Sequence, residues 1–275
     1  MCGIAGIVAE APPRELVERM TRTLTHRGPD DSGVWESDGA CLGHTRLSIL
    51  DLSSAGHQPM TKGHLAVVYN GEIYNFRELR RELPGPFASE TDTEVLLHLY
   101  ERDGADMVQR LRGMFAFAIW DAGKRHLFAA RDRLGIKPLF YREVPGGLAF
   151  GSEIKALLEI GRPDMDTTAL RDFFSYKYVP HPKTIYAGIH RLPPAHTLSW
   201  AGGQLETRRY WEPSAETRIT DMGAATERLG ELLEHVVPEH TVSDVPVGLF
   251  LSGGIDSTTL AAHLDQPRTF TLAVE

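Results

Sequence analysis

Short runs of apolar residues, many alternating with polar positions, recur along the first two hundred residues between turn-forming segments. This pattern is typical of strands. The expected strands cover residues 1–8, 33–36, 40–49, 65–69, 114–121, 126–131, 139–142, 148–151, 196–200 and 204–211. Apolar residues at helical spacing predict helices at 16–24, 76–83, 91–100, 153–158 and 166–174. The mixture predicts packed sheets covered by helices, in one α+β domain over residues 1–205.

The remaining residues follow a different pattern. Residues 206–221 are polar and predict a linker. An amphipathic helix at 224–235 is followed by an apolar strand at 245–251, a Gly-rich loop, a helix that ends at residue 263 and a strand at 269–274. Because a strand, a helix and a second strand in this order form a parallel sheet, we expect a second, α/β domain over residues 222–275.

Composition narrows the class of protein. The 275 residues are 42% hydrophobic, which is enough for a full core. A net charge of -8 without a dense basic stripe argues against nucleic acid as the main partner. No apolar run reaches the roughly 20 residues of a membrane helix. The two cysteines lack metal-ligand spacing, as expected in a reducing cytoplasm. We therefore expect a cytoplasmic protein that acts on small molecules.

Cys2 is the first candidate for chemistry, because it follows Met1 directly. If Met1 is removed, Cys2 carries a thiol and a free α-amine on one residue. An α-amine titrates near pH ~7.7 to 8.0, so part of it is available as a base at neutral pH. The alternative is that Cys2 is a small buried hydrophobic residue, which is the commoner fate of a free cysteine.

Four further residues have side chains or backbone suited to catalysis or binding, and each also has a purely structural interpretation. Arg46 could offer its planar fork to a carboxylate, or it could pair with a structural acid such as Asp51. Asn70 and Gly71 could bind an oxyanion through a side-chain amide and a backbone N–H, or form a hairpin turn. Asp92, in the first turn of a predicted helix, suits the helix dipole and could also hold an ammonium group.

Three predicted helices carry signals for their first residues. Asn75 with Glu78, and Thr91 with Glu94, have the spacing of a capping box. Ser152 is expected to cap the helix at 153–158. These signals predict where helices begin, and they place Asp92 in a first turn.

Residues 252–257 read Ser-Gly-Gly-Ile-Asp-Ser between a buried strand and a helix. Glycines let backbone N–H groups face a phosphate, both serines can donate, and Asp256 is a natural Mg²⁺ ligand. The sequence lacks the pattern of a Walker A loop. A Gly-rich packing turn is the alternative, but two serines and an acid exceed what a turn needs.

With these residues identified, the chain resembles the glutamine-hydrolysing asparagine synthetase family over essentially its whole length. The motifs that carry the resemblance are Met-Cys-Gly-Ile at 1–4, His-Arg-Gly-Pro-Asp at 26–30, Arg-Leu-Ser-Ile at 46–49, Asn-Gly-Glu-Ile-Tyr-Asn at 70–75, Asp92, Gly-Met-Phe-Ala-Phe at 113–117, Arg-Asp-Arg-Leu-Gly at 131–135 and the loop at 252–257. The resemblance implies a four-layer α/β/β/α glutaminase domain of the N-terminal-nucleophile type, followed by the beginning of an ATP-pyrophosphatase domain with a parallel sheet.

The resemblance also implies roles in glutamine hydrolysis. Cys2 would attack the carboxamide while its amine moves the proton, and Asn70 and Gly71 would stabilise the oxyanion. Arg46 would bind the α-carboxylate of glutamine. The α-ammonium would be held by Glu72 and Asp92. Backbone of the segment after Arg46 would line the pocket, at Leu47, Ser48, Ile49 and Leu50.

In the second domain the resemblance implies that ATP activates aspartate as an acyl-adenylate, which ammonia then converts to asparagine. Phe250 would lie near the nucleotide, and Asp256 would bind Mg²⁺ through pyrophosphate. The pyrophosphate would be held by Ser252, Gly253, Gly254, Asp256 and Ser257. The implied cofactors are ATP and Mg²⁺, without a prosthetic group. A homodimer is an open expectation.

The chain stops one strand after the loop, so we expect a fragment or a truncated product that by itself performs only the glutaminase half-reaction. Two alternatives stay open: a related amidotransferase with another carboxylate acceptor, and a non-catalytic remnant. No catalytic role is expected for Cys41, His44 or His57, and Arg131 and Asp132 are expected to be structural.

Overall fold

The structure is a computed structural model that describes residues 1–216 and 218–273. It divides into two compact units, Met1–Glu212 and Pro213–Glu275. Strand β12 (Gln204–Arg209) belongs to the first unit and crosses residue 205. The predicted domain limits at 205 and 222 stay a prediction.

Two six-stranded sheets form the first unit, and every strand pair within them is antiparallel. The first sheet has the order β10 (His190–Arg191), β8 (Phe140–Val144), β9 (Gly147–Gly151), β1 (Gly3–Val8), β3 (Ala40–Arg46) and β2 (Asp31–Ser37). The second has the order β12, β11 (His196–Ala201), β7 (His126–Arg131), β6 (Gly113–Asp121), β5 (Leu65–Ile73) and β4 (Met60–Lys62).

Strand β1 shows why the first sheet is covered on both faces. Ile4 and Val8 pack into the core between the two sheets, whereas Ala5 and Ile7 face a second core formed with helices. Since side chains alternate along a strand, burial on both faces requires the apolar run found here. The helices on the outer face are α1 (Arg14–Arg22) and α4 (Ile154–Leu158).

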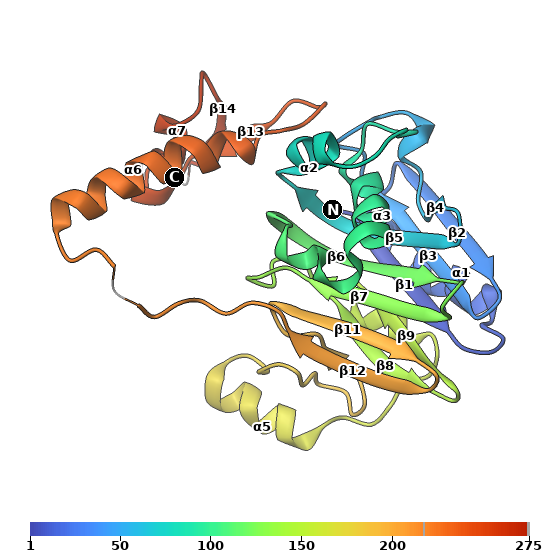
Figure 1. The fold of residues 1–275 in the computed structure, drawn as a ribbon. Helices are drawn as coiled ribbons and strands as arrows, with labels where there is room; N and C mark the ends of the chain where they lie inside the picture. Colours follow the sequence, from blue (N-terminus) through green and yellow to red (C-terminus); the bar gives the residue numbers. More distant parts are fainter. Residues whose placement is uncertain (217, 274–275) are drawn as a thin grey trace. The chain divides into compact units, whose positions relative to one another are not determined.

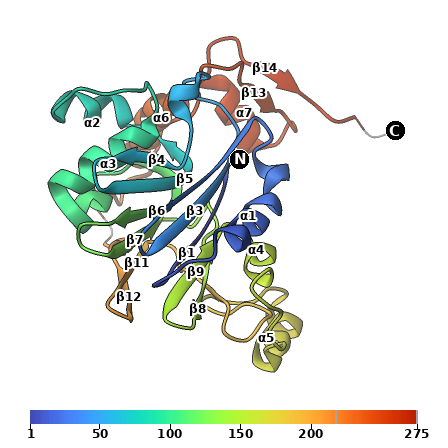
Figure 2. The same cartoon turned by 90° about the vertical axis from the view of Figure 1, so that its right-hand side faces the viewer.

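Helix α3 (Asp92–Asp103) covers the second sheet, where Tyr100 stacks on Phe128 of β7 with ring centroids 5.6 Å apart. Helix α2 (Phe76–Glu82) packs beside α3. The layers are therefore helix, sheet, sheet and helix, as Figures 1 and 2 show. The predicted α/β/β/α sandwich is confirmed.

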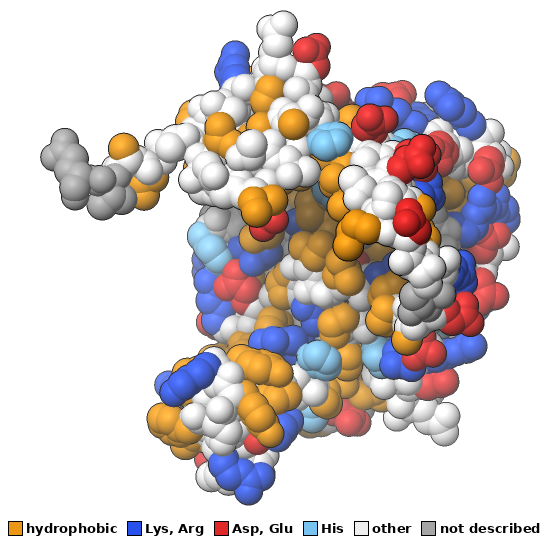
Figure 3. Space-filling model, turned by 90° about the vertical axis from the view of Figure 1, so that its left-hand side faces the viewer, with side chains coloured by type: hydrophobic (Ala, Val, Ile, Leu, Met, Phe, Trp, Pro, Cys, Tyr) orange, Lys and Arg blue, Asp and Glu red, His pale blue; other side chains and the backbone are white. Residues whose placement is uncertain are grey.

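Short 3-10 helices connect these layers at η1 (Thr25–Arg27), η2 (Ser54–Gly56) and η3 (Gly104–Gln109). Helix α5 (Thr167–Tyr176) begins after Asp166, whose carboxylate accepts from the amides of Thr168 and Ala169. Phe173, Phe174 and Tyr176 of α5 are exposed. Apolar side chains gather over α5 on the face drawn in Figure 3.

The second unit contains α6 (Met222–Glu239), β13 (Gly248–Phe250), α7 (Ile255–Ala262) and β14 (Arg268–Phe270). Strands β13 and β14 pair in parallel, as predicted from the order of the elements. Both strands are shorter than expected, and the predicted end of the last strand at Val274 lies outside the described residues. Among the described helices, none has the length and apolar content to cross a membrane.

Tertiary hydrogen bonds account for one shifted strand end and for one missing helix cap. The strand predicted at 40–49 ends at Arg46, because the next amides are used elsewhere: Leu47 donates to the Cys2 thiol and Ser48 to Asp30. Asn75 makes no capping bond; its side chain instead bonds the backbone of Arg110 and Arg112.

The other two helix-start signals had different outcomes. Ser152 does not cap α4, since its hydroxyl accepts from the amide of Ile4. The cap by Thr91 is confirmed, because its hydroxyl accepts from the amide of Glu94. The Glu94 carboxylate bonds the amides of Ala88 and Ser89, so it fixes the preceding loop.

Candidate active site

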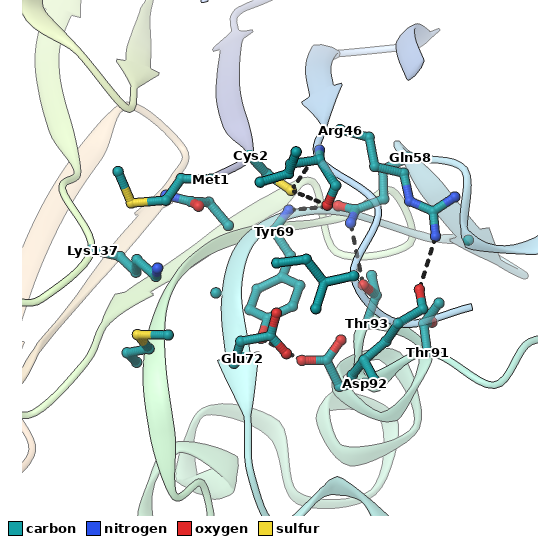
Figure 4. Close-up of a pocket in the computed structure, with 17 residues that line it drawn as sticks. Met1, Cys2, Arg46, Gln58, Tyr69, Glu72, Thr91, Asp92, Thr93 and Lys137 are labelled. Atoms are coloured by element: carbon teal, nitrogen blue, oxygen red, sulfur yellow. Dashed lines mark hydrogen bonds between the residues drawn. The ribbon is translucent and has the colours of Figure 1, made fainter. Parts of the chain in front are cut away.

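A cavity of about 210 Å³ opens at the end of β1, bordered by residues of β3, β5 and the start of α3 (Figure 4). Most of the predicted glutamine-site residues line it: Cys2, Arg46, Leu47, Ile49, Leu50, Asn70, Gly71, Glu72 and Asp92. Ser48 does not line the cavity, and its amide bonds Asp30 at 2.8 Å. Segments far apart in sequence therefore meet at one concave site.

Cys2 lies at the end of a central strand, beside the segment that follows β3. Its Sγ accepts from the Leu47 amide at 3.4 Å and is 3.7 Å from the Leu47 carbonyl, to which the thiol can donate. Arg27 donates to the Cys2 carbonyl at 2.9 Å and also binds Glu153. Burial raises the pKa of the Cys2 thiol, while the bond to Leu47 opposes that rise. The thiol is held in place but needs electrostatic help to ionise.

Asn70 and Gly71 lie inside β5 and pair with Ala116 and Phe115 of β6, so the hairpin alternative is wrong. Asn70 is 1% exposed, and its Nδ2 has no hydrogen-bond partner among the described residues. A buried donor without a partner costs about 1–3 kcal/mol, and a bound anion would satisfy it. At Gly71 a Cβ would lie 2.3 Å from the carbonyl oxygen of Met114, so the strand pairing requires glycine.

Arg46 is buried and tied to the loop after β3. Its guanidinium donates to the carbonyls of Ser53 at 2.9 Å, Leu50 at 3.1 Å and Asp51 at 2.5 Å. A Cβ at Gly56 would lie 1.8 Å from its Nη2, so glycine makes room for the guanidinium. Arg46 therefore fixes the loop and still borders the cavity, which leaves donors for a ligand carboxylate.

Asp92 and Glu72 supply the negative charge of the cavity. The Asp92 carboxylate accepts from the Tyr69 hydroxyl at 2.6 Å and from the Ile73 amide at 2.9 Å. In Figure 4 the side chains of Glu72 and Asp92 point toward each other. Burial raises the pKa of both carboxyl groups, and the charge of Asp92 raises that of Glu72 further. Two carboxyl groups in this position suit a ligand ammonium group, which would favour their ionised forms.

The sequence analysis assigned no role in the site to the other residues of the cavity wall, namely Met1, Gly56, Gln58, Tyr69, Thr91, Thr93, Met114 and Lys137. Gln58 connects two of them, because it accepts from the Tyr69 amide at 2.8 Å and donates to the Thr93 hydroxyl at 3.2 Å. Tyr69 directly precedes Asn70 and could have been found from its position. Lys137 gives no comparable signal, because a lysine in a charged turn normally faces solvent.

Residues without an expected catalytic role have structural contacts. Cys41 is buried in the core below α1, and His44 is buried against the Tyr69 carbonyl with its pKa lowered by burial to about 3. Arg131 donates to three carbonyls, and Asp132 accepts from backbone amides of the turn at 133–137. These contacts fix the fold around the cavity.

The Ser-Gly-Gly-Ile-Asp-Ser loop of the second unit is exposed. Gly253 has a φ of +76°, and the hydroxyls of Ser252 and Ser257 lie 3.1 Å apart. Asp256 lies in the first turn of α7. Phe250 is 85% exposed at the end of β13. Hydroxyl groups, a helix N-terminus and a carboxylate together fit a phosphate with its counter-ion.

Fold and site together are those expected of an N-terminal-nucleophile amidotransferase, and comparison with known proteins identifies the family. Residues 1–211 match the glutamine amidotransferase domain family, and residues 228–275 match the asparagine synthase family. The chain therefore belongs to the glutamine amidotransferase domain family.

Curated relatives extend this result. A glutamine-hydrolysing asparagine synthetase of Bacillus subtilis is 42% identical over 95% of this chain and 45% of its own length. A putative enzyme of the same name from Mycobacterium tuberculosis is 39% identical over 100% of this chain and 48% of its own. Amidase chyE of Penicillium rubens is 35% identical over 95% of this chain and 42% of its own length. The chain spans about half the length of these relatives, and the resemblance inferred from the motifs is confirmed.

Solved structures support the fold. The glutamine phosphoribosylpyrophosphate amidotransferase of B. subtilis matches with a TM-score of 0.60 at 17% identity, over 98% of this chain and 65% of that chain. At this identity the match shows the fold alone. It agrees with the two-sheet sandwich of the first unit.

Proposed function

We propose that this chain hydrolyses glutamine to glutamate and ammonia, with Cys2 as the nucleophile. The observation that supports this proposal most strongly is that Cys2, Asn70, Glu72 and Asp92 line one cavity, and that the Asn70 side-chain amide has no hydrogen-bond partner among the described residues. Each group matches one part of glutamine or of its tetrahedral intermediate.

The chemistry requires removal of Met1, whose side chain is 56% exposed. The freed α-amine of Cys2 takes the thiol proton, and Sγ forms a bond to the carboxamide carbon. Asn70 Nδ2 and the Gly71 amide donate to the oxyanion. The C–N bond then breaks as the amine returns the proton to the departing nitrogen, which leaves as ammonia. Water next attacks the thioester, giving one proton to the thiolate and leaving glutamate.

Substrate binding uses the two ends of the cavity. At one end, Arg46 is fixed by its bonds to the carbonyls of Leu50 and Ser53 and would bind the α-carboxylate of glutamine. Glu72 and Asp92 would bind the α-ammonium. Backbone of Leu47 and Ile49 would border the side chain of glutamine. This arrangement favours a free amino acid over a peptide-linked glutamine, because both charged ends are bound.

For the longer protein we propose ATP-dependent amidation of aspartate, supported by the asparagine synthase match at 228–275 and the names of the bacterial relatives. ATP would bind at Ser252, Gly253, Gly254 and Ser257, with Phe250 near the nucleotide. Asp256 would hold Mg²⁺, which would balance phosphate charge. In this proposal the reaction uses ATP and Mg²⁺ and needs no prosthetic group. A second candidate is an amidotransferase with another carboxylate acceptor, because similar relatives carry different names, one of them that of an amidase.

Location and assembly belong to the same proposal. The described cysteines are unpaired, which supports a reducing cytoplasm. A homodimer is the assembly that we propose to test by sedimentation. Acceptor choice is tested by assaying the full-length protein with aspartate and with other carboxylic acids. Asparagine formation supports the first candidate, and amidation of only another acid supports the second.

The direct test of the glutaminase is glutamate release from the purified chain. Cys2→Ala should abolish release, because no nucleophile remains. The matched control is Cys41→Ala, which removes the other cysteine from a core without cavity contact and should retain activity in the folded protein. Glutamate release by the Cys2→Ala variant would overturn the proposal, as would inactivity of a wild-type chain with a free Cys2 amine.

A further inference from the structure

Lys137 lies in the wall of the Cys2 cavity although it belongs to a charged turn. Its side chain is 6% exposed. The turn is fixed from both sides: the Lys137 amide donates to the Asp132 carboxylate at 2.9 Å, and its carbonyl accepts from Arg131 at 2.7 Å. In Figure 4, Lys137 lies across the cavity from Arg46. The backbone therefore holds the side chain where the fold leaves little access to bulk water.

The ammonium group of Lys137 has neither a hydrogen bond nor an ion pair to any residue in the described part of the chain. Burying a charged amine without a direct partner is costly. Burial accordingly lowers the pKa of Lys137, whereas the charges of Glu72 and of the Cys2 thiolate favour its protonated form. The fold thus keeps a cation facing the cavity at an energetic cost.

Other charges around the cavity come from several elements. Glu72 on β5 and Asp92 on α3 disfavour the Cys2 thiolate. Burial lowers the pKa of the terminal amine of Met1, and the charges of Lys137 and of Arg27 in η1 lower it further, whereas Cys2 and Asp30 raise it. Asp132 favours the protonated form of Lys137. Two acids therefore oppose ionisation of the thiol, and the chain's terminal ammonium favours it. Arg46 and Lys137 are the cationic side chains of the same cavity wall, and Arg46 is tied to loop carbonyls.

We propose that the Lys137 ammonium is the positive charge that favours the thiolate of Cys2 and the unprotonated α-amine beside it, and so sets the pH range of the glutaminase. A nearby cation stabilises a thiolate and disfavours an ammonium group, so both ends of Cys2 respond in the same direction. Lys137 is then a positioning residue that acts through Cys2. The inference rests on the proposed glutaminase function.

The test compares Lys137→Met with Lys137→Arg in the mature chain. Removal of the charge should move the acidic limb of kcat/KM for glutamine to higher pH by roughly 0.5 to 1 unit, which is about a 3- to 10-fold loss on that limb. Lys137→Arg should restore most of the shift. Lys124→Met, which removes an exposed lysine outside the cavity wall, is the control and should leave the profile unchanged.

A second measurement needs no substrate. The rate of Cys2 alkylation by iodoacetamide, followed by mass spectrometry across pH, reports the thiolate directly. The Lys137→Met curve should move to higher pH in the same direction as the rate profile. If that variant fails to fold by circular dichroism, Lys137→Gln provides a second neutral side chain.

If folded Lys137→Met shows the same pH dependence of alkylation and of kcat/KM as the wild type, the proposed role of Lys137 is wrong. Glutamine turnover by the wild type would still support the glutaminase. A rise in KM with unmoved alkylation would also contradict that role of Lys137, because Lys137 would then bind the substrate. If the wild type releases no glutamate, the proposed function fails, whereas the alkylation curves still decide the effect of Lys137 on Cys2.

Discussion

The Cys2 cavity and the loop at 252–257 are both candidate binding sites, but the fold constructs them differently. Asn70 and Asp92 are buried and fixed by strand pairing and by hydrogen bonds from Tyr69 and Ile73. Phe250 and Ser252 are exposed and Ser257 is half-buried, and the bonds of the two serines run within the loop. The first site is therefore preorganised by a core, whereas the second offers donors that a phosphate would have to order. Substitutions should accordingly affect the two sites in different ways.

The largest expected effect is a loss of catalysis without a loss of stability, on substitution of Asn70 in the Cys2 cavity. Asn70→Ala should lower kcat for glutamine hydrolysis by about 10²- to 10³-fold, because one oxyanion donor is lost. Its Nδ2 has no partner in the described structure, so the substitution breaks no hydrogen bond of that group and removes the cost of an unpaired donor; the free energy of unfolding should not fall. Stopped assays of kcat and KM, with urea unfolding of the same protein, measure both quantities.

Asn75→Ala is the matched control, since the Asn75 amide bonds Arg110 at 3.0 Å and Arg112 at 2.9 Å. Losing these bonds should lower the free energy of unfolding by about 1–3 kcal/mol. The kcat of the folded variant should stay near that of the wild type. A kcat loss in Asn75→Ala equal to that in Asn70→Ala would show that both act through the fold.

Glycine substitutions test whether only the first site is fixed by packing. Gly71→Ala would place a Cβ 2.3 Å from the Met114 carbonyl and should destabilise the first unit by about 2 kcal/mol or more. At Gly253 a Cβ meets nothing within 4 Å, and the φ of +76° alone should cost about 1 kcal/mol in the second unit.

Tryptophan fluorescence distinguishes the two units, because all four tryptophans lie in the first, at Trp35, Trp120, Trp200 and Trp211. Urea unfolding should show a lower midpoint for Gly71→Ala and an unchanged midpoint for Gly253→Ala. Equal shifts in both variants would remove the distinction between the two sites.

A smaller effect concerns the carboxyl pair. Burial raises the folded-state pKa of Glu72 above its usual value of 4.5, so the folded protein binds the proton more tightly than the unfolded chain does. Wild-type stability should therefore fall as the pH rises from about 4.5 through the raised pKa. Glu72→Gln removes this dependence and should be more stable than the wild type at pH 8, by on the order of 1 kcal/mol, with little difference at pH 4. Melting temperatures of both proteins at pH 4 and pH 8 measure this difference in stability. A lower stability of Glu72→Gln than of the wild type at pH 8 would contradict the prediction.

The sequence predicted the first site better than its surroundings. Cys2, Asn70 and Asp92 could be found because polar or reactive groups stand at the ends of predicted elements. Lys137 could not, because its burial depends on how Asp132 and Arg131 fold the turn. The predicted helix cap at Asn75 is wrong because local spacing does not show that its side chain bonds the distant backbone of Arg110 and Arg112.

The boundaries of β3 and of β13 illustrate two further limits. Apolar alternation continued past Arg46, but the amides of Leu47 and Ser48 bond Cys2 and Asp30 in place of a neighbouring strand. In the second unit the apolar run at 245–251 contains only the short strand Gly248–Phe250. Hydrophobic pattern predicts that a strand exists, whereas its ends depend on which partners the fold supplies.

The central claim is that a mature N-terminal Cys2 is the glutamine nucleophile. Mass spectrometry of the N-terminal peptide after treatment with a thiol-reactive glutamine analogue tests it most directly. We expect a peptide that begins at Cys2 and carries the analogue on that residue, with Cys41 unmodified and glutamate release abolished in proportion. An active protein that retains Met1, or inactivation without an adduct on Cys2, would contradict the account.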